Sequence, residues 1–196
     1  LDLPVLYEGS WARDQATYGP YGPKKRIVSA LSNYHIKAWP YVNALNYYVI
    51  RYADLLLWKA ESQVELGDLE GARATVNLVR ERAAQSQVVT KLDSEEAADN
   101  YKLAAYTKTW TDPADARAKV RLERRLELAM EGHRFFDLVR WGVAAETMNS
   151  YFEEEKLIRS HLVNGRFVEG KHEYLPIPQT YIDTMDPELV EQNPNY

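Results

Sequence analysis

Apolar residues recur at spacings of three and four from about Tyr48 onward, a period that predicts amphipathic helices. The first stripe breaks at Gly67 and Asp68, and a second stripe runs from Leu69 to about Ala84. The apolar positions of the two stripes are Ile50, Ala53, Leu57, Ala60 and Val64, followed by Leu69, Ala72, Val76 and Val79. Two helices joined by a turn that contains glycine predict an antiparallel helical hairpin.

The hairpin also has the spacing of one tetratricopeptide-type repeat, in which a small residue such as Ala72 lets the two helices approach closely. Only one clear copy of such a repeat is visible in the sequence. A single repeat cannot bury its own apolar face, so we expect the covering residues to come from elsewhere in this chain or from upstream of it.

More helices are predicted in the second half of the chain. Asp112 followed by Pro113 is a helix start signal, because the aspartate caps the first turn and proline fits its first position. Gly132 weakens the helical pattern, and Gly142 stops it. Helices are expected over residues 95–110, from Pro113 to about Met130 or Glu131, from there to Trp141, and from Val143 to Leu157, with a short strand at Val88 to Thr90.

Both ends of the chain are predicted to be irregular. Residues 1–47 show no period and are rich in Gly, Pro, Tyr and Trp, which favours turns and short extended pieces. So long a stretch is unusual in a compact domain. Either its aromatic rings pack on the rest, or part of its fold depends on chain upstream. From His161 the sequence is again irregular, with a Leu-Pro-Ile-Pro run and the ending NPNY.

Composition narrows the class of protein. The 196 residues suffice for one domain, and a net charge of −5 disfavours nucleic acid as a partner, since proteins that bind it usually carry a basic excess. The absence of cysteine excludes disulfides, thiolate nucleophiles and cysteine-ligated metals. No run of about 18 apolar residues could span a membrane. We expect any targeting or lipid-anchor signal to lie upstream of Leu1.

The most distinctive segment is Val120 to Gly142, VRLERRLELAMEGHRFFDLVRWG. Helical spacing pairs Arg124 with Glu127, Glu131 with Arg134, and Asp137 with Arg140. Exposed pairs would contribute only about 0.3–0.5 kcal/mol each. We therefore expect several to be partly buried, with arginines binding carboxylates and backbone carbonyls between helices. The residues expected on the packed side are Val120, Leu122, Leu126, Ala129 and Met130, and those expected to surround the charges are Phe135, Phe136, Leu138, Val139 and Trp141.

The same segment allows two chemical alternatives. Glu131 beside His133 could be a base with its neighbour, and these two with Asp137 could be metal ligands. Residues two apart point to different sides of a helix, however, so Glu131 and His133 converge only if Gly132 breaks the helix. The remaining histidines, His35, His161 and His172, are isolated. Structural packing is therefore preferred, and no catalytic residue, metal ligand or cofactor is predicted.

Three blocks of sequence follow one another from about Ile50 to Tyr196: the helical pair IRYADLLLWKAESQVELGDLEGARATVNLVRERA, the strip RLERRLELAMEGHRFFDLVRWG and the ending YLPIPQTYIDTMDPELVEQNPNY. Together they resemble the SusD/RagB family of outer-membrane nutrient-binding lipoproteins. The residues of the strip that form this structural signature are Arg121, Glu123, Arg124, Arg125, Glu127, Glu131, Gly132, His133, Arg134, Phe136, Asp137, Arg140 and Trp141.

The resemblance implies a mainly α fold, with tetratricopeptide-like hairpins and a loop-rich irregular region. It further implies that residues 1–196 form a single domain that corresponds to the C-terminal part of a longer protein. Within it we expect an aromatic loop-rich region at 1–47, the hairpin at 48–85, a helical region with the signature strip at 95–157, and an extended C-terminal segment at 158–196.

The resemblance also implies a function without catalysis. A family member would capture an oligosaccharide or other nutrient and deliver it to a SusC-like TonB-dependent transporter. It would be held at the outer membrane by a lipidated N-terminal cysteine, which this chain lacks. Two other functions stay open from the residues alone: a tetratricopeptide-type scaffold that binds a peptide or protein, and a carbohydrate-active enzyme, which would need two carboxylates facing each other across a cleft.

The ligand site of such a protein is not marked by the three blocks, so it must be inferred from chemistry. Sugars stack their C–H faces on aromatic rings, and the loop-rich start is the richest source of such rings. The candidates are Trp11, Tyr18, Tyr21, Trp39 and Tyr41. Alternatively, these rings only pin the loop to the helices. Trp58 and Trp141 are expected in the core or in the packing between helices, and the place of Trp110 is left open.

Overall fold

The computed structural model describes residues 25, 33, 34, 36, 38, 39 and 42, and residues 44–91, 94–186 and 188–196. The chain divides into two compact units, one that ends at Gly132 and one that includes His133–Tyr196. Within the described residues the named regular elements are helical, and Thr90 and Ala97 form an isolated antiparallel bridge. The mainly α fold is therefore confirmed, and the short strand expected near Thr90 is reduced to that bridge.

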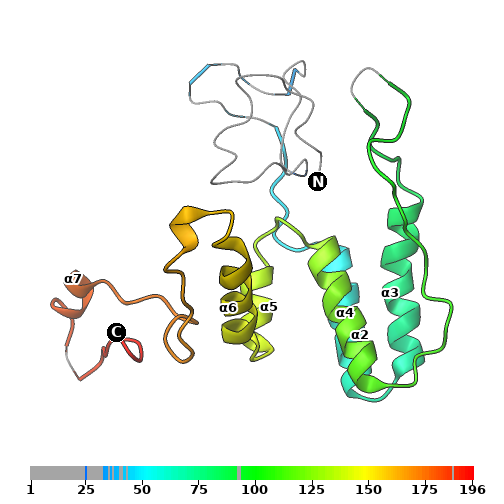
Figure 1. Cartoon of the computed structure of the whole chain (residues 1–196). Helices are drawn as coiled ribbons and strands as arrows, with labels where there is room; N and C mark the ends of the chain where they lie inside the picture. Colours follow the sequence, from blue (N-terminus) through cyan, green and yellow to red (C-terminus); the bar gives the residue numbers. More distant parts are fainter. Residues whose placement is uncertain are drawn as a thin grey trace. The chain divides into compact units, whose positions relative to one another are not determined.

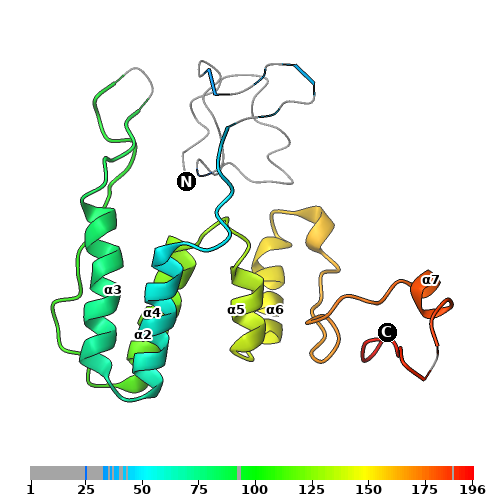
Figure 2. The ribbon, with the colours of Figure 1, turned by 180° about the vertical axis from the view of Figure 1, so that it is seen from behind.

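The first unit contains the helices α2 (Tyr52–Glu65), α3 (Leu69–Ala84) and α4 (Pro113–Glu127). They lie side by side in both views, and each contacts the other two (Figures 1 and 2). Their shared core consists of Leu57, Ala60, Val64, Ala72, Val76, Val79, Trp110, Ala116 and Val120. The predicted α2–α3 hairpin is confirmed. Ile50, expected at the start of its stripe, precedes α2 and is exposed.

Aspartates cap two of these helices; the cap at Asp112 was predicted, whereas Asp68 was read only as a break between two helices. The Asp68 carboxylate accepts a hydrogen bond from the backbone N–H of Gly71 at 2.9 Å, at the first turn of α3. The Asp112 carboxylate accepts one from the N–H of Ala114 at 3.0 Å, with Pro113 in the first turn of α4. Each bond satisfies an N–H group that has no partner within its own helix.

The helix predicted over residues 95–110 is wrong, because this segment runs as extended chain and turns. Side chains of α3 bind its backbone instead. Asn77 Nδ2 donates to the carbonyl oxygen of Tyr106 at 3.0 Å, and Asn77 Oδ1 accepts from the N–H of Tyr106 at 2.7 Å. Arg80 Nε donates to the carbonyl of Ala104 at 2.7 Å. Trp110, which was left open, is buried and meets the ring of Tyr106 edge-on.

α4 ends earlier than predicted and buries a different face. After Glu127 the chain turns through Met130 and Gly132, whose φ angles of 65° and 86° are not helical. Leu122, Leu126 and Met130 were expected on the packed side but are exposed. The buried positions of the helix and its first following turn are Ala116, Val120, Glu123, Arg124 and Leu128. The spacing of the inner face is helical, but two of its members are charged.

The second unit begins with a shorter pair of helices, α5 (Arg134–Arg140) and α6 (Ala144–Glu155), which confirms both predicted helices. They lie side by side in both views of the molecule (Figures 1 and 2). The pair is followed by a 3-10 turn, η2 (Ser160–Leu162), and a single helical turn, α7 (Gln179–Ile182). The buried core is small and consists of Leu138, Ala144 and Phe167.

The irregular C-terminal segment is held by side-chain amides. Asn149 of α6 donates from Nδ2 to the carbonyl of Phe167 at 3.0 Å and accepts at Oδ1 from its N–H at 2.8 Å. Gln192 forms the same two-bond pair with Ile177, at 2.9 and 2.8 Å. Further bonds to carbonyls run from Asn193 to Leu175, from Asn195 to Gly170 and from Tyr196 to Tyr174. The described part of this segment is mostly irregular, with η2 and α7 as short helical elements within it, and these side-chain bonds to its backbone hold it.

Candidate functional site

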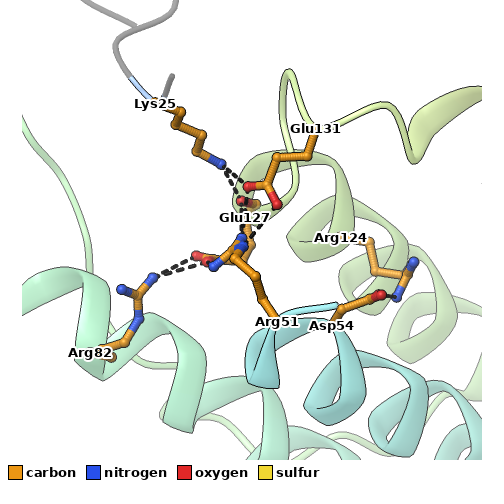
Figure 3. A network of polar contacts seen from close by, with 7 residues as sticks. All are labelled: Lys25, Arg51, Asp54, Arg82, Arg124, Glu127 and Glu131. Carbon is orange, nitrogen blue, oxygen red and sulfur yellow. Dashed lines mark hydrogen bonds and ion pairs between the residues drawn. The ribbon is translucent and has the colours of Figure 1, made fainter. Parts of the chain in front are cut away.

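A single arginine, Arg51, binds the two glutamates that lie one turn apart at the end of α4 (Figure 3). Arg51 Nε and Nη2 donate to the two carboxylate oxygens of Glu131, each at 2.8 Å. Its Nη1 donates to Glu127 Oε1 at 2.8 Å, and Nη2 also donates to the carbonyl oxygen of Glu127 at 3.1 Å. This two-pronged binding across helices is the arrangement that the sequence predicts for the strip.

Two further cations complete this network (Figure 3). Lys25 Nζ donates to Glu131 Oε1 and to the carbonyl of Glu127, both at 2.6 Å, and Arg82 of α3 donates to both oxygens of Glu127 at 3.0 Å. Burial alone would raise the pKa of Glu131. The hydrogen bonds and positive charges of Arg51 and Lys25 outweigh it, so this pKa lies below its usual value of 4.5. The carboxylate is therefore ionised at neutral pH.

A second ion pair lies deeper between α2 and α4. Arg124 Nη1 donates to Asp54 Oδ1 at 2.8 Å, and both side chains are only 2% exposed. Beside it, Glu123 accepts a bond from Arg80 Nη1 of α3 at 2.7 Å. Burial raises the pKa of Glu123, and the hydrogen bond and charge of Arg80 only partly offset that rise. The inner face of α4 is thus closed by charged groups that have partners on α2 and α3.

The rest of the strip lies in the second unit. Arg140 donates from Nε to Asp137 Oδ1 at 2.9 Å, which confirms the predicted pair of α5. Trp141 was expected in the core or between helices; it is half-buried and lies under the Arg140 guanidinium, whose Cζ is 5.0 Å from the centroid of the Trp141 ring. Phe136 is 71% exposed, so it does not shield the charges as expected.

The thirteen signature residues are placed as follows. Arg121, Glu123, Arg124, Arg125 and Glu127 lie on α4, Glu131 and Gly132 in the turn after it, His133 at the cap of α5, Arg134, Phe136, Asp137 and Arg140 on α5, and Trp141 at its end. The hydrogen bonds and positive charges of Arg51 and Lys25 lower the pKa of Glu131, which makes it a poor general base. Asp137 is bound by Arg140. Among the residues that the structure describes, no cluster of His, Asp and Glu could hold a metal ion.

Most of the nominated ligand residues cannot be placed. Trp11, Tyr18, Tyr21 and Tyr41 lie outside the described residues. Trp39 is described and is 85% exposed. In contrast, the tryptophan of α2 corrects an expectation. Trp58 was expected in the core or between helices but is 42% exposed, because the inward positions of α2 are Asp54, Leu57, Ala60 and Val64.

Sequence reasoning missed the partners that fix these groups. Arg51 stands just before a helix and carries no signal that distinguishes it from a surface arginine. Asn77 and Asn149, whose amides bind backbone groups, were not singled out from the sequence. Asp54 did give a usable signal, since a carboxylate at helical spacing among apolar residues indicates a buried charge that needs a cation.

In the part of the chain that the structure describes, every helix is too short or too polar to span a membrane.

Comparison with known proteins places the chain among relatives. The sequence profile of the SusD family matches residues 9–196. SusD-like protein P38 of Formosa agariphila is 34% identical over 142 residues, which are 68% of this chain and 26% of that protein. SusD-like protein P25 of the same organism is 29% identical over 148 residues, 76% of this chain and 24% of that protein. The chain thus spans about a quarter of the length of these relatives.

The likeness extends to structure. The crystal structure of a SusD homolog from Bacteroides thetaiotaomicron is similar with a TM-score of 0.57 and 31% sequence identity, over 79% of this chain and 28% of that one. Its matched part shares the helical fold described above. The family profile covers nearly the whole chain, including the hairpin, the charged strip and the C-terminal segment. This chain therefore belongs to the SusD family.

Proposed function

We propose that this chain is part of a nutrient-binding protein of the outer membrane, which captures an oligosaccharide or other nutrient and delivers it to a SusC-like TonB-dependent transporter. Membership of the SusD family over residues 9–196 carries the proposal. A lipidated cysteine upstream of these residues would hold the protein at the membrane. The proposal includes no reaction, since the carboxylates of the charged strip that bind cations are engaged in holding helices together.

In this proposal the helices support the loops, and the aromatic side chains of the loops bind the ligand. The face of a tryptophan or tyrosine ring suits the C–H face of a sugar, and neighbouring polar groups bind its hydroxyls. The supporting observation within the described residues is Trp39, which leaves 85% of its surface to solvent. Rings that serve only to pin a loop would be expected to lose more of their surface to the helices.

The test uses the full-length protein and a panel of soluble oligosaccharides in isothermal titration. For an oligosaccharide that binds, Trp39→Ala combined with Trp11→Ala should weaken affinity about tenfold or more, because a central aromatic contact contributes roughly 2 kcal/mol. Trp58→Ala is the matched control, since it removes an exposed tryptophan from α2 rather than from the loops. An unchanged affinity in the double variant would remove the proposed platform.

A separate measurement tests delivery. The full-length protein should copurify with a TonB-dependent barrel from outer membranes, and the double tryptophan variant should copurify equally well if its rings bind only ligand. If oligosaccharides of every class fail to bind while the barrel still copurifies, capture of a peptide or another nutrient becomes the better proposal. If neither binds, the uptake function is wrong.

A protein-interaction scaffold is the second candidate. The observation that favours it is the outward row of α4 and its following turn, where Leu122, Leu126 and Met130 are 45%, 54% and 60% exposed. Leu126→Glu would place a charge in this row. A variant that loses a protein partner but keeps its affinity for an oligosaccharide would separate the two functions.

A further inference from the structure

Asn164 and Gly165 form the single Asn-Gly dipeptide of the sequence, and they lie between η2 and the extended segment that holds Phe167. Asn164 is exposed, and Gly165 is partly buried. A Cβ atom at residue 165 would lie 2.9 Å from Cδ1 of Phe152 and 3.0 Å from the carbonyl oxygen of Leu162. Glycine is therefore needed at this position for close packing, and it leaves an exposed asparagine in front of a residue without a side chain.

This pair of residues has a chemical consequence. Without a Cβ on residue 165, its backbone nitrogen can approach the side-chain carbonyl carbon of Asn164 with little steric hindrance. The new N–C bond closes a cyclic imide, the bond from that carbon to the amide nitrogen breaks, and the nitrogen leaves as ammonia with the proton of Gly165. Water then opens the imide at either carbonyl and yields aspartate or isoaspartate. Only water is consumed.

We propose that Asn164 is a site of spontaneous deamidation, and that the packing of Gly165 against Phe152 sets its rate. In the folded turn the N–H of Gly165 donates to the carbonyl of Leu162 at 2.9 Å. That bond must break before the nitrogen can attack, and the ring of Phe152 limits how far the backbone can move. The reaction therefore proceeds from locally opened states, whose population depends on local stability.

The product would disturb the second unit at a sensitive place. Isoaspartate lengthens the main chain by one methylene and adds a negative charge, three residues before Phe167. Phe167 belongs to the buried cluster that the described residues of this unit form with Leu138 and Ala144, and Asn149 holds it through its backbone. A main chain that is longer by one methylene at the turn would move Phe167 relative to the core cluster and to Asn149, and its contacts with both depend on its position. Deamidation would thus loosen the C-terminal segment as the protein ages.

The test incubates the full chain at neutral pH and follows each asparagine-containing peptide by mass spectrometry. A synthetic peptide of residues 160–170 and the Asn164→Gln variant are run beside it. The gain in mass from amide to acid should be confined to the peptide with Asn164 and absent from Asn164→Gln. The deamidation rate of the folded chain should be lower than that of the synthetic peptide by about tenfold or more, because the reaction requires local opening.

Two variants separate packing from exposure. Phe152→Leu should speed both deamidation and hydrogen exchange of the Gly165 amide, whereas Phe136→Leu, the same change at an exposed ring, should alter neither. Subdenaturing urea on the unchanged chain should raise both rates together. Equal rates in folded chain and peptide, faster reaction at another asparagine, or faster exchange at Gly165 without faster deamidation would each overturn the proposal.

Discussion

The unit that ends at Gly132 and the unit that includes His133–Tyr196 fix their chains with different chemistry. In the first, Arg51 and Arg80 bind carboxylates of α4, and Arg124 of α4 binds Asp54 of α2, so that ion pairs join the helices. In the second, the neutral amides of Asn149 and Gln192 pair with the backbone of extended segments. Buried charges impose a large penalty on any misaligned contact, whereas amides satisfy the backbone groups of a chain that forms no sheet.

This difference has consequences for stability. Ion pairs respond to pH and, where exposed, to salt. Amide–backbone pairs carry no charge and should respond to neither. The first unit also contains one amide pair, Asn77 with Tyr106, which makes a comparison within a charged surrounding possible. Substitutions at each kind of contact can therefore test whether the response of stability to pH and salt depends on the type of contact or on the unit that contains it.

The largest effect is expected at the buried pair between Asp54 and Arg124. Asp54→Ala leaves the guanidinium without this carboxylate in a site where both side chains are 2% exposed. We expect a loss of about 3–5 kcal/mol in unfolding free energy, measured by urea denaturation. Glu65→Ala is the control, since its pair with Arg117 is largely exposed. Equal losses in the two variants would show that burial does not determine how much an ion pair contributes to the unfolding free energy.

The next effect concerns the amide pair of the second unit. Asn149→Ala leaves the N–H and the carbonyl of Phe167 without this partner, and we expect a loss of about 2–3 kcal/mol. Asn77→Ala should have a similar cost through Tyr106 in the first unit. Both losses, followed by urea denaturation, should be the same at low and neutral pH. A pH-dependent loss in either variant would contradict the comparison.

Periodicity and capping signals predicted much of the first unit. The α2–α3 hairpin followed from apolar spacing and the break at Gly67 and Asp68, and the start of α4 followed from the cap signal of Asp112. The inner face of α4 could not be predicted in this way, because a search for apolar residues selects Leu122 and passes over the buried Arg124. Charged residues can occupy a core position only when partners from other helices are present, and a single helix does not reveal those partners.

Tertiary contacts also determine the conformation of residues 95–110. Its local composition allows a helix, but bonds from Asn77 and Arg80 engage its backbone in an extended form. The candidate site was less predictable than the fold. Composition located the aromatic residues of the loops, but which rings face solvent depends on packing. Trp58 and Trp110 show this: Trp58, expected in the core or between helices, is partly exposed, and Trp110, left undecided, is buried.

A third prediction uses the pH response of the Glu131 network. The pKa of Glu131 is lower in the folded chain than its usual 4.5, so this group stabilises the fold above pH 4.5 and that contribution is lost as the pH falls through the folded pKa. At neutral pH, Glu131→Gln should cost about 1–2 kcal/mol, because bonds from Arg51 and Lys25 weaken. At low pH the two proteins should converge in urea denaturation.

Glu123 supplies the control of opposite sign. Burial raises its folded pKa above 4.5, so its contribution is fully present below pH 4.5 and declines as the pH rises through the folded value. Relative to Glu123→Gln, the unchanged chain should therefore become less stable as the pH rises. A parallel pH dependence for the two substitutions would mean that the bound cations, rather than burial, dominate at both glutamates.

The smallest effect should appear at the exposed pair between Glu65 and Arg117. Their side chains are 52% and 34% exposed, and such pairs are screened by dissolved ions. Glu65→Gln should give a loss that is measurable only at low salt and falls within error at high salt. The Glu131→Gln loss should persist at high salt, because that side chain is 9% exposed. If salt abolished both losses alike, the network around Arg51 would be an ordinary surface cluster, and the charged contacts would not distinguish the first unit from the second.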